Sequence, residues 1–179
     1  MIASLEHLYI EPIHEKHAWR LCDFCTSNID RLKRFFPKTL EQNLTPDLSK
    51  YFVEQKVKEF HAKEEFLFVL KEKEQHTLVG LIYVKELDWN KKQAELAYAM
   101  SYQEEGKGYM TETVQKVSEW VFKELALETL QIIVHKSNIG SVRIAEKSRF
   151  VWKKILIAEH TPPGEAPLDM ELYELNYEG

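Results

Sequence analysis

The sequence is poor in glycine, in cysteine and in long apolar runs, and each shortage excludes something. Its 179 residues include only six glycines, about half of the roughly twelve that average usage would give. Two of the six, Gly106 and Gly108, stand within three residues of each other, which indicates that the backbone has a special requirement there. With only two cysteines, we expect a reduced, cytoplasmic protein without a disulfide framework.

The missing apolar runs and the charge balance exclude further classes. No run approaches the roughly 20 apolar residues of a membrane span, and the first residues lack the basic region and apolar core of a signal peptide. The formal net charge is −5, from 24 basic and 29 acidic residues. Phosphate backbones require a clustered basic surface, so we expect no nucleic-acid partner, whereas a basic substrate such as an amine fits the sign.

What is present is typical of a globular chain, with 44% hydrophobic and 30% charged residues. A chain of this length can bury roughly 70% of its unfolded surface, so it needs neither disulfides nor metal to fold. No repeat, low-complexity tract or Gly/Ser linker interrupts the sequence. We therefore expect residues 1–179 to form a single domain.

The periodicity of apolar residues predicts a mixed α/β fold. Residues 130–134, Leu-Gln-Ile-Ile-Val, are mostly apolar and favour a short strand that is buried on both faces. Between 93 and 134 the order is strand, glycine turn, helix, strand, at the centre of a mixed sheet covered by helices. Helices are predicted over 15–28, 29–36 (closed by Pro37), 45–60 (capped by Thr45 or Asp47), 109–125 and 139–147, and strands over 5–13, 66–71, 78–87, 93–101, 130–134, 150–158 and 168–175.

The Gly106-Lys107-Gly108 turn lies between a predicted strand and the helix that opens at Tyr109. Glycines allow the backbone amides to point inward together and a ligand to approach closely. The first turn of the helix adds a partial positive charge, so the turn predicts an anion site, most often for phosphate. A plain strand-to-helix turn explains the two glycines equally well.

Two common phosphate motifs are excluded. A dinucleotide fingerprint requires a third glycine, which neither Met110 nor Thr111 supplies. A Walker A loop requires Gly-Lys-Ser/Thr, but here Lys107 is followed by Gly108 and Tyr109.

A longer segment around the turn carries a resemblance to a known family. Residues 105–112, Glu-Gly-Lys-Gly-Tyr-Met-Thr-Glu, resemble the acetyl-CoA pyrophosphate loop of the GNAT N-acetyltransferase superfamily, in particular the branch of ribosomal-protein N-terminal acetyltransferases. Residues 138–150 resemble that branch's Asn-x-x-Ser-x-Arg-x-x-Glu-Lys-x-Gly-Phe segment, and 94–98 match its Glu-(Ile/Leu)-Gly-Tyr strand. The order of elements agrees from 5 to 175.

The sequence departs from the family pattern at three places. Glu105 stands where the superfamily has Gln or Arg, and a carboxylate beside a diphosphate should weaken CoA binding unless it points outward. Ala97 and Arg149 stand where relatives keep glycine. If Arg149 is left-handed, its side chain costs on the order of 1 kcal/mol.

The resemblance implies a GNAT-like fold: a twisted, mostly antiparallel sheet of about seven strands, flanked by helices on both faces and splayed at a central parallel pair. It also implies acetyl-CoA as the acetyl donor, without a metal. The implied acetyl-CoA contacts come from the end of one strand, the glycine turn and the second motif: Ala99, Met100, Glu105, Gly106, Lys107, Gly108, Tyr109, Met110, Thr111, Asn138 and Ser141.

The implied reaction is acetyl transfer to a primary amine by direct attack in a ternary complex. A protein N-terminal amine is the leading acceptor, with polyamines and aminoglycoside-like amines behind it. A non-catalytic CoA-binding module is the alternative, because fold alone does not set function. The resemblance is compatible with a monomer or a homodimer.

Two residues are candidate catalytic groups. Glu95 could remove the amine proton, directly or through water, although a solvated strand carboxylate would look the same in sequence. Asn138 and Ser141 have the spacing of a helix cap, Asn138 oxygen to Ser141 amide. The resemblance implies in addition that Ser141 protonates the leaving thiolate.

The remaining candidates have simpler explanations. His135 ends a predicted strand and is more typical of a structural histidine. Cys22 and Cys25, with His14 and His17 nearby, suggest zinc, but both cysteines lie on an apolar helical face and favour a place in the core. A final group of aromatic residues suits an acceptor pocket or the core: Phe35, Phe36, Tyr51 and Trp89.

Overall fold

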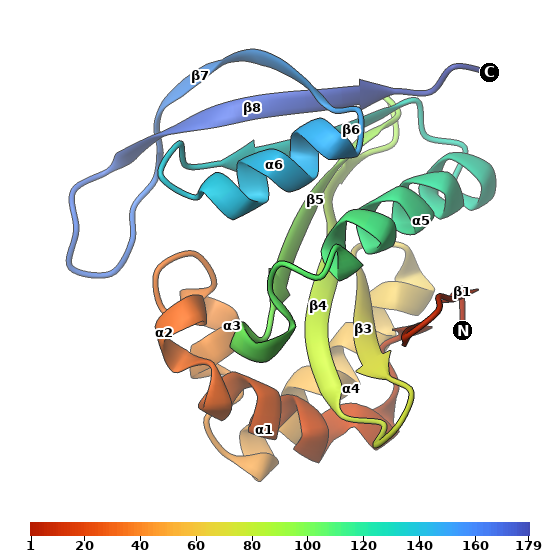
Figure 1. Ribbon diagram of the computed structural model, residues 1–179, viewed down its shortest axis with the longest axis vertical. Helices are drawn as coiled ribbons and strands as arrows, with labels where there is room; N and C mark the ends of the chain where they lie inside the picture. The colour runs from red at the N-terminus through yellow and green to blue at the C-terminus, as the bar shows by residue number, and fades with distance from the viewer. The chain divides into compact units, whose positions relative to one another are not determined.

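Eight strands form one mixed sheet in the computed structural model, which describes all 179 residues (Figure 1). The strand order is β1-β2-β3-β4-β5-β6-β8-β7. β5 and β6 pair in parallel, and β1–β2, β2–β3, β6–β8 and β7–β8 pair antiparallel. The strands are β1 (Ala3–Ser4), β2 (Leu8–Pro12), β3 (Phe66–Glu72), β4 (Leu78–Asp88), β5 (Gln93–Met100), β6 (Thr129–Val134), β7 (Val151–His160) and β8 (Leu168–Asn176).

The predicted mixed α/β class is confirmed, with one strand more than expected. The addition is β1, two residues long, which pairs with β2 through Ala3↔Ile10 and Ser4↔Tyr9. So short a segment carries no periodicity from which it could be predicted.

Helices flank the sheet, and their beginnings follow local rules. Thr45 caps α4, since its Oγ1 accepts a hydrogen bond from the Leu48 amide at 3.2 Å. The predicted helix over 29–36 is wrong at its end: α2 stops at Leu32, and Pro37 starts α3, because proline suits the first position of a helix. The helices are η1 (Glu15–His17), α1 (Ala18–Ser27), α2 (Ile29–Leu32), α3 (Pro37–Glu41), α4 (Pro46–Ala62), η2 (Tyr102–Glu104), α5 (Tyr109–Glu124) and α6 (Ile139–Lys147). None of them is long and apolar enough to cross a membrane.

The chain divides into two compact units. Unit 1 contains residues 1–83 and 98–105, and unit 2 contains residues 84–97 and 106–179. β4 and β5 each run through both units, and the chain passes from unit 1 to unit 2 between Glu105 and Gly106.

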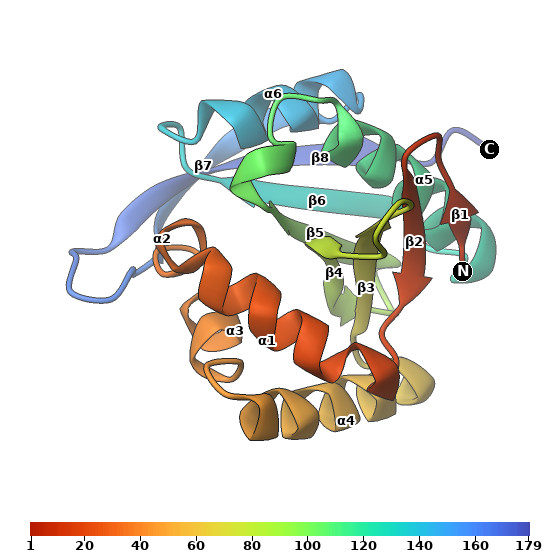
Figure 2. The same cartoon turned by 60° about the horizontal axis from the view of Figure 1, so that its bottom comes forward.

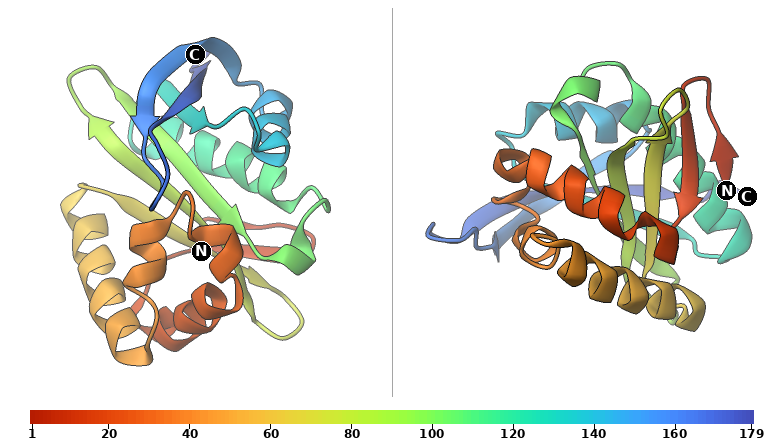
Figure 3. Two further views of the ribbon diagram at one scale, coloured as in Figure 1. Left: turned by 90° about the vertical axis from the view of Figure 1, so that its left-hand side faces the viewer. Right: turned by 90° about the horizontal axis from the view of Figure 1, so that it is seen from below.

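In unit 1, α1 and α4 lie side by side (Figures 2 and 3). α4 also packs against β3, where the Phe60 ring meets the rings of Phe66 and Phe68 edge-on, with centroids 4.9 and 5.5 Å apart. β3 is buried from Phe66 to Leu70, so it forms the centre of this unit's core.

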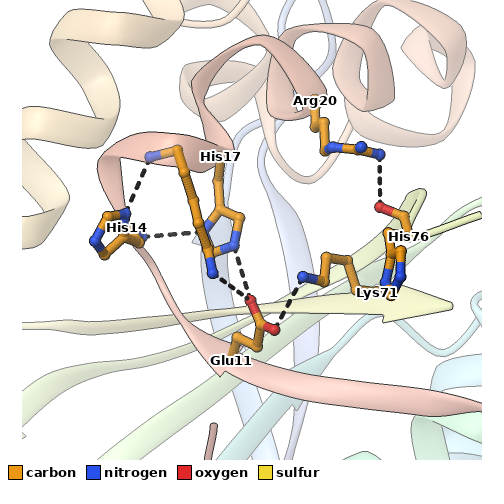
Figure 4. Close-up of polar contacts among 7 residues, drawn as sticks. Glu11, His14, His17, Arg20, Lys71 and His76 are labelled. Atoms are coloured by element: carbon orange, nitrogen blue, oxygen red, sulfur yellow. Dashed lines mark hydrogen bonds and ion pairs between the residues drawn. The ribbon is translucent and has the colours of Figure 1, made fainter. Parts of the chain in front are cut away.

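A polar cluster fixes the start of α1 against β2 and β3 (Figure 4). The His14 amide donates to His17 Nδ1 at 3.0 Å, so His17 carries its proton on Nε2 and donates to Glu11 Oε2 at 3.0 Å. Lys71 Nζ lies 2.9 Å from the other oxygen of Glu11. His17 therefore binds a half-buried carboxylate and the His14 amide holds the His17 ring, in place of the zinc site that their spacing suggested.

In unit 2, β6 pairs with β5 on one side and β8 on the other, while α5 and α6 pack together and α6 contacts β6. The expected burial of β6 on both faces is wrong. Leu130, Ile132 and Val134 are buried, but the alternate residues are half-exposed, and Gln131 Nε2 donates to Glu174 Oε2 at 2.8 Å. β6 thus has one apolar face and one face with polar groups.

Candidate active site

The glycine turn has the special backbone that its sequence predicts. Gly106 and Gly108 both have left-handed backbone, with φ of +80° and +81°. A Cβ built at either residue would meet nothing within 4 Å. The two glycines therefore line open space, and packing within the protein does not require them there.

α5 begins directly at this turn. Gly108 is the N-cap residue, and no side chain caps the helix. The first backbone amides of an α-helix have no partner inside the helix and carry its positive dipole end. An open turn next to an uncapped helix start fits an anionic diphosphate.

The apolar side of α5 is buried in the core, which fixes the position of the helix that follows the turn. Met110, Val114, Val117 and Val121 are all buried. Met110 is only 4% exposed. Its side chain thus belongs to the core, and only its backbone can contribute to the turn.

The end of β5 lies in unit 1 against β4. A Cβ at Gly80 of β4 would stand 2.8 Å from Leu70 Cδ1 and 3.0 Å from the Ala99 carbonyl oxygen. The Ser101 amide donates to the Val79 carbonyl at 2.7 Å. Gly80 therefore lets β4 approach the backbone at Ala99, a role that sequence analysis missed although a lone glycine in a strand is a signal for it.

Glu95 lies in the part of β5 that belongs to unit 2, and its side chain is only 14% exposed. Burial raises its pKa above the ordinary value, with Glu86 and Glu159 adding to the rise and Lys85 opposing it. Lys85 Nζ stands 4.0 Å from Glu95 Oε1. Glu95 is thus not a solvated carboxylate, and its raised pKa makes it a better proton acceptor.

Asn138 and Ser141 are brought together at the start of α6, which follows the carboxyl end of β6. Asn138 Oδ1 accepts a hydrogen bond from the Ser141 amide at 3.3 Å, so the predicted helix cap is confirmed. Both residues are half-exposed. A proton-donating role for the Ser141 hydroxyl stays a prediction.

The departures from the family pattern have clear local structures. Arg149, which follows α6, is left-handed with φ of +68°, as expected for a place where relatives keep glycine. Ala97 lies within β5, which is continuous from Gln93 to Met100. The carboxylate of Glu105 is paired with Arg31, Nη1 to Oε2 at 2.9 Å. No motif in the sequence points to Arg31.

The cysteines and His135 have structural surroundings. Cys22 and Cys25 are confirmed as core residues, with exposures of 8% and 0%, and burial raises the pKa of Cys25 to about 12. No group of three or more His, Cys, Asp or Glu side chains could hold a metal ion. His135 Nδ1 accepts from the Ser137 amide at 3.2 Å and lies 2.6 Å from its hydroxyl, which defines a local turn.

The four aromatic candidates differ. Phe36 stacks on Tyr83 with ring centroids 6.3 Å apart. Tyr51 and Trp89 are 71% and 45% exposed, so neither is a core residue. Acceptor contact for Phe35, Phe36, Tyr51 and Trp89 stays a prediction.

Comparison with known proteins gives a consistent result. A family model described as an acetyltransferase (GNAT) domain matches residues 7–151. YjcK of Bacillus subtilis (strain 168), described as a probable N-acetyltransferase, is 24% identical over 144 residues, which is 80% of each chain.

Two solved structures share the fold. Ribosomal-protein-S5-alanine acetyltransferase from Vibrio fischeri superposes with a TM-score of 0.92 at 20% identity, over 98% of this chain and 96% of that one. The ribosomal L7/L12 α-N-protein acetyltransferase RimL, solved with coenzyme A, superposes with a TM-score of 0.88 at 14% identity, over 99% and 98%.

Proposed function

This chain belongs to the GNAT acetyltransferase family, and from that premise we propose that it transfers an acetyl group from acetyl-CoA to a primary amine in a ternary complex. The observation that carries the proposal is the open turn of Gly106 and Gly108 at the uncapped start of α5. A protein N-terminal amine is the leading acceptor, since two proteins of similar fold are named for ribosomal proteins.

The residues proposed to hold acetyl-CoA form three groups. The backbone of 106–111 receives the diphosphate, the backbone near Ala99 and Met100 receives the pantetheine arm, and Asn138 and Ser141 contact CoA from α6. When bound, acetyl-CoA supplies an activated acyl group whose leaving atom is a thiolate sulfur. Residues 1–179 act as one acetyltransferase domain in this proposal, and the family match includes residues of both units.

Two side chains move protons in the proposed reaction. An amine reaches the protein mainly as an ammonium ion, which is not a nucleophile until it loses a proton. The Glu95 carboxylate accepts that proton, directly or through one water, and its burial and raised pKa suit the task. As the new carbon–nitrogen bond forms and the carbon–sulfur bond breaks, the Ser141 hydroxyl donates a proton to the departing sulfur and regains one from the acetylated nitrogen. Most of the acceleration comes from holding two reactants together.

The test is thiol release from acetyl-CoA with a panel of amines: peptides beginning with Ala or Ser, spermidine, and an aminoglycoside. We expect release with at least one class, with the N-terminal peptides ahead of the rest. Glu95→Gln should lower kcat by about 10²-fold or more, the usual contribution of a general base. Lys33→Met, a substitution at an exposed pair with Asp30, is the matched control and should leave the rate unchanged.

Binding measurements separate the alternatives. Acetyl-CoA that binds in calorimetry without turnover of any amine would favour the non-catalytic module. Absence of acetyl-CoA binding would overturn the proposal altogether.

A further inference from the structure

Three contacts fasten the segment before the glycine turn to the corner between α1 and α2. The Tyr102 amide donates to Asn28 Oδ1 at 3.2 Å. The Arg31 guanidinium lies over the Tyr102 ring, 5.0 Å from its centroid. Arg31 Nη1 then donates to Glu105 Oε2 at 2.9 Å. All four residues belong to unit 1.

The corner that supplies these contacts is itself well held. Asn28 closes α1, and its Nδ2 donates to the Phe24 carbonyl at 2.8 Å. Arg31 follows on α2, and its side chain is 27% exposed, whereas that of Glu105 is 52% exposed. Arg31 is thus fixed between an aromatic ring and a carboxylate, so its charge is held in place.

The pair matters because of where Glu105 stands in the chain. Glu105 directly precedes Gly106, the first glycine of the proposed diphosphate turn. An unpaired carboxylate there would repel a diphosphate. In the structure its negative charge is matched by a guanidinium at hydrogen-bond distance.

We infer that Arg31 is a positioning residue for acetyl-CoA binding, which acts by holding and neutralising Glu105 beside the glycine turn. The inference rests on the proposed function, since it concerns the same turn. It explains how the chain carries an acidic residue at this place: the compensating charge comes from α2, 74 residues earlier.

The test is a double-mutant cycle on acetyl-CoA affinity, measured by calorimetry at low ionic strength. Arg31→Met should weaken binding roughly three- to fivefold, since exposed charge interactions rarely change an equilibrium constant by more. Glu105→Gln should tighten it by about twofold, because Arg31 then keeps an unmatched positive charge. The double variant should return to within about twofold of the wild type.

Two controls separate charge from structure. Lys33→Met removes the same charge from the same corner, where Lys33 pairs only with exposed Asp30 at 2.8 Å, and should leave the affinity unchanged. At about 0.5 M salt the Arg31→Met penalty should shrink, because surface charges are then screened within a few ångströms. A defect that came from lost packing would persist at that salt.

Several results would overturn the inference. Arg31→Met could bind acetyl-CoA as tightly as the wild type does. The double variant could bind it as weakly as Arg31→Met does, or Glu105→Gln could bind it more weakly than the wild type. Glu105→Gln keeps the test decisive even if Arg31→Met does not fold. A wild-type protein that binds no acetyl-CoA would overturn the proposed function as well. If the wild type binds acetyl-CoA and all three variants bind it with the same affinity, this inference alone would be overturned.

Discussion

Arg149→Gly should stabilise the protein, because Arg149 holds a backbone conformation that glycine adopts at no steric cost. Two hydrogen bonds close α6 around it: the Arg149 amide donates to the Glu146 carbonyl at 3.1 Å, and the Phe150 amide to the Ala145 carbonyl at 3.0 Å. This pattern is the Schellman motif, whose left-handed residue is most often glycine. Arg149 occupies that place with φ of +68° and an exposed side chain.

The expected gain is the difference between two terms. A side chain in the left-handed region costs about 1–2 kcal/mol. Glycine gives back about 0.4–1 kcal/mol, since it makes the unfolded chain more flexible. At the midpoints of these two ranges the net gain in unfolding free energy is about 0.8 kcal/mol, which raises Tm by roughly 2–3 °C in a chain of this size.

Urea unfolding followed by circular dichroism measures the change, with Arg149→Ala as the matched control. Alanine removes the same exposed side chain but keeps the Cβ, so it should stay within about 0.5 kcal/mol of the wild type. An Arg149→Gly protein no more stable than Arg149→Ala would refute the reasoning, because the two differ only in the Cβ and the freedom it removes.

Three further predictions concern the site and its support. Activity should rise with pH as Glu95 loses its proton, around its raised pKa. Lys85 lowers this pKa, so Lys85→Met should move the rising part of the pH–activity profile to higher pH, whereas Lys85→Arg should leave it in place. A profile that does not move in Lys85→Met would exclude Glu95 as the titrating base. Gly80→Ala should destabilise the fold by about 1–3 kcal/mol and raise KM for acetyl-CoA, because the new Cβ would stand 3.0 Å from the Ala99 carbonyl oxygen. An unchanged KM in a folded variant would contradict the role proposed for the end of β5. Burial lowers the pKa of His17 from 6.5 to about 4, so its contribution to stability is present above pH 6.5 and is lost as the pH falls toward 4. The loss is about 2–3 kcal/mol, and His17→Gln, which can keep both hydrogen bonds, should flatten the unfolding free energy over that range.

Local sequence patterns predicted most of the helices and strands, because apolar residues repeat about every 3.6 residues in a helix and every second residue in a strand. The apolar side of α5, Met110 to Val121, repeats as a helix does, and 138–141 has the spacing of a cap. Pro37 shows the limit of such rules, since proline is compatible both with the end of one helix and with the start of the next. The sequence could not reveal that α3 begins there.

Contacts between distant residues could not be predicted in the same way. Arg31 and Glu105 are 74 residues apart, and no local pattern distinguishes Arg31 from the other charged residues of its segment. The exposure of Glu95 likewise depends on what surrounds β5 in the folded chain, because alternation along a strand indicates only that Glu95 and Leu96 point to opposite faces. Chemistry that depends on burial or on a distant partner required the fold.

The residues with left-handed backbone help to explain why a chain with so few glycines has two of them at 106 and 108. Seven residues other than glycine have positive φ, among them Lys63, Ala126 and Arg149, so this chain tolerates the strain of left-handed backbone at many places. Backbone conformation alone therefore does not explain why glycine is kept at 106 and 108. Nothing in the protein lies within 4 Å of a Cβ at either residue, so packing does not explain it either. What glycine alone provides there is uncovered backbone that a ligand can approach closely, and this is what a diphosphate at the start of α5 requires.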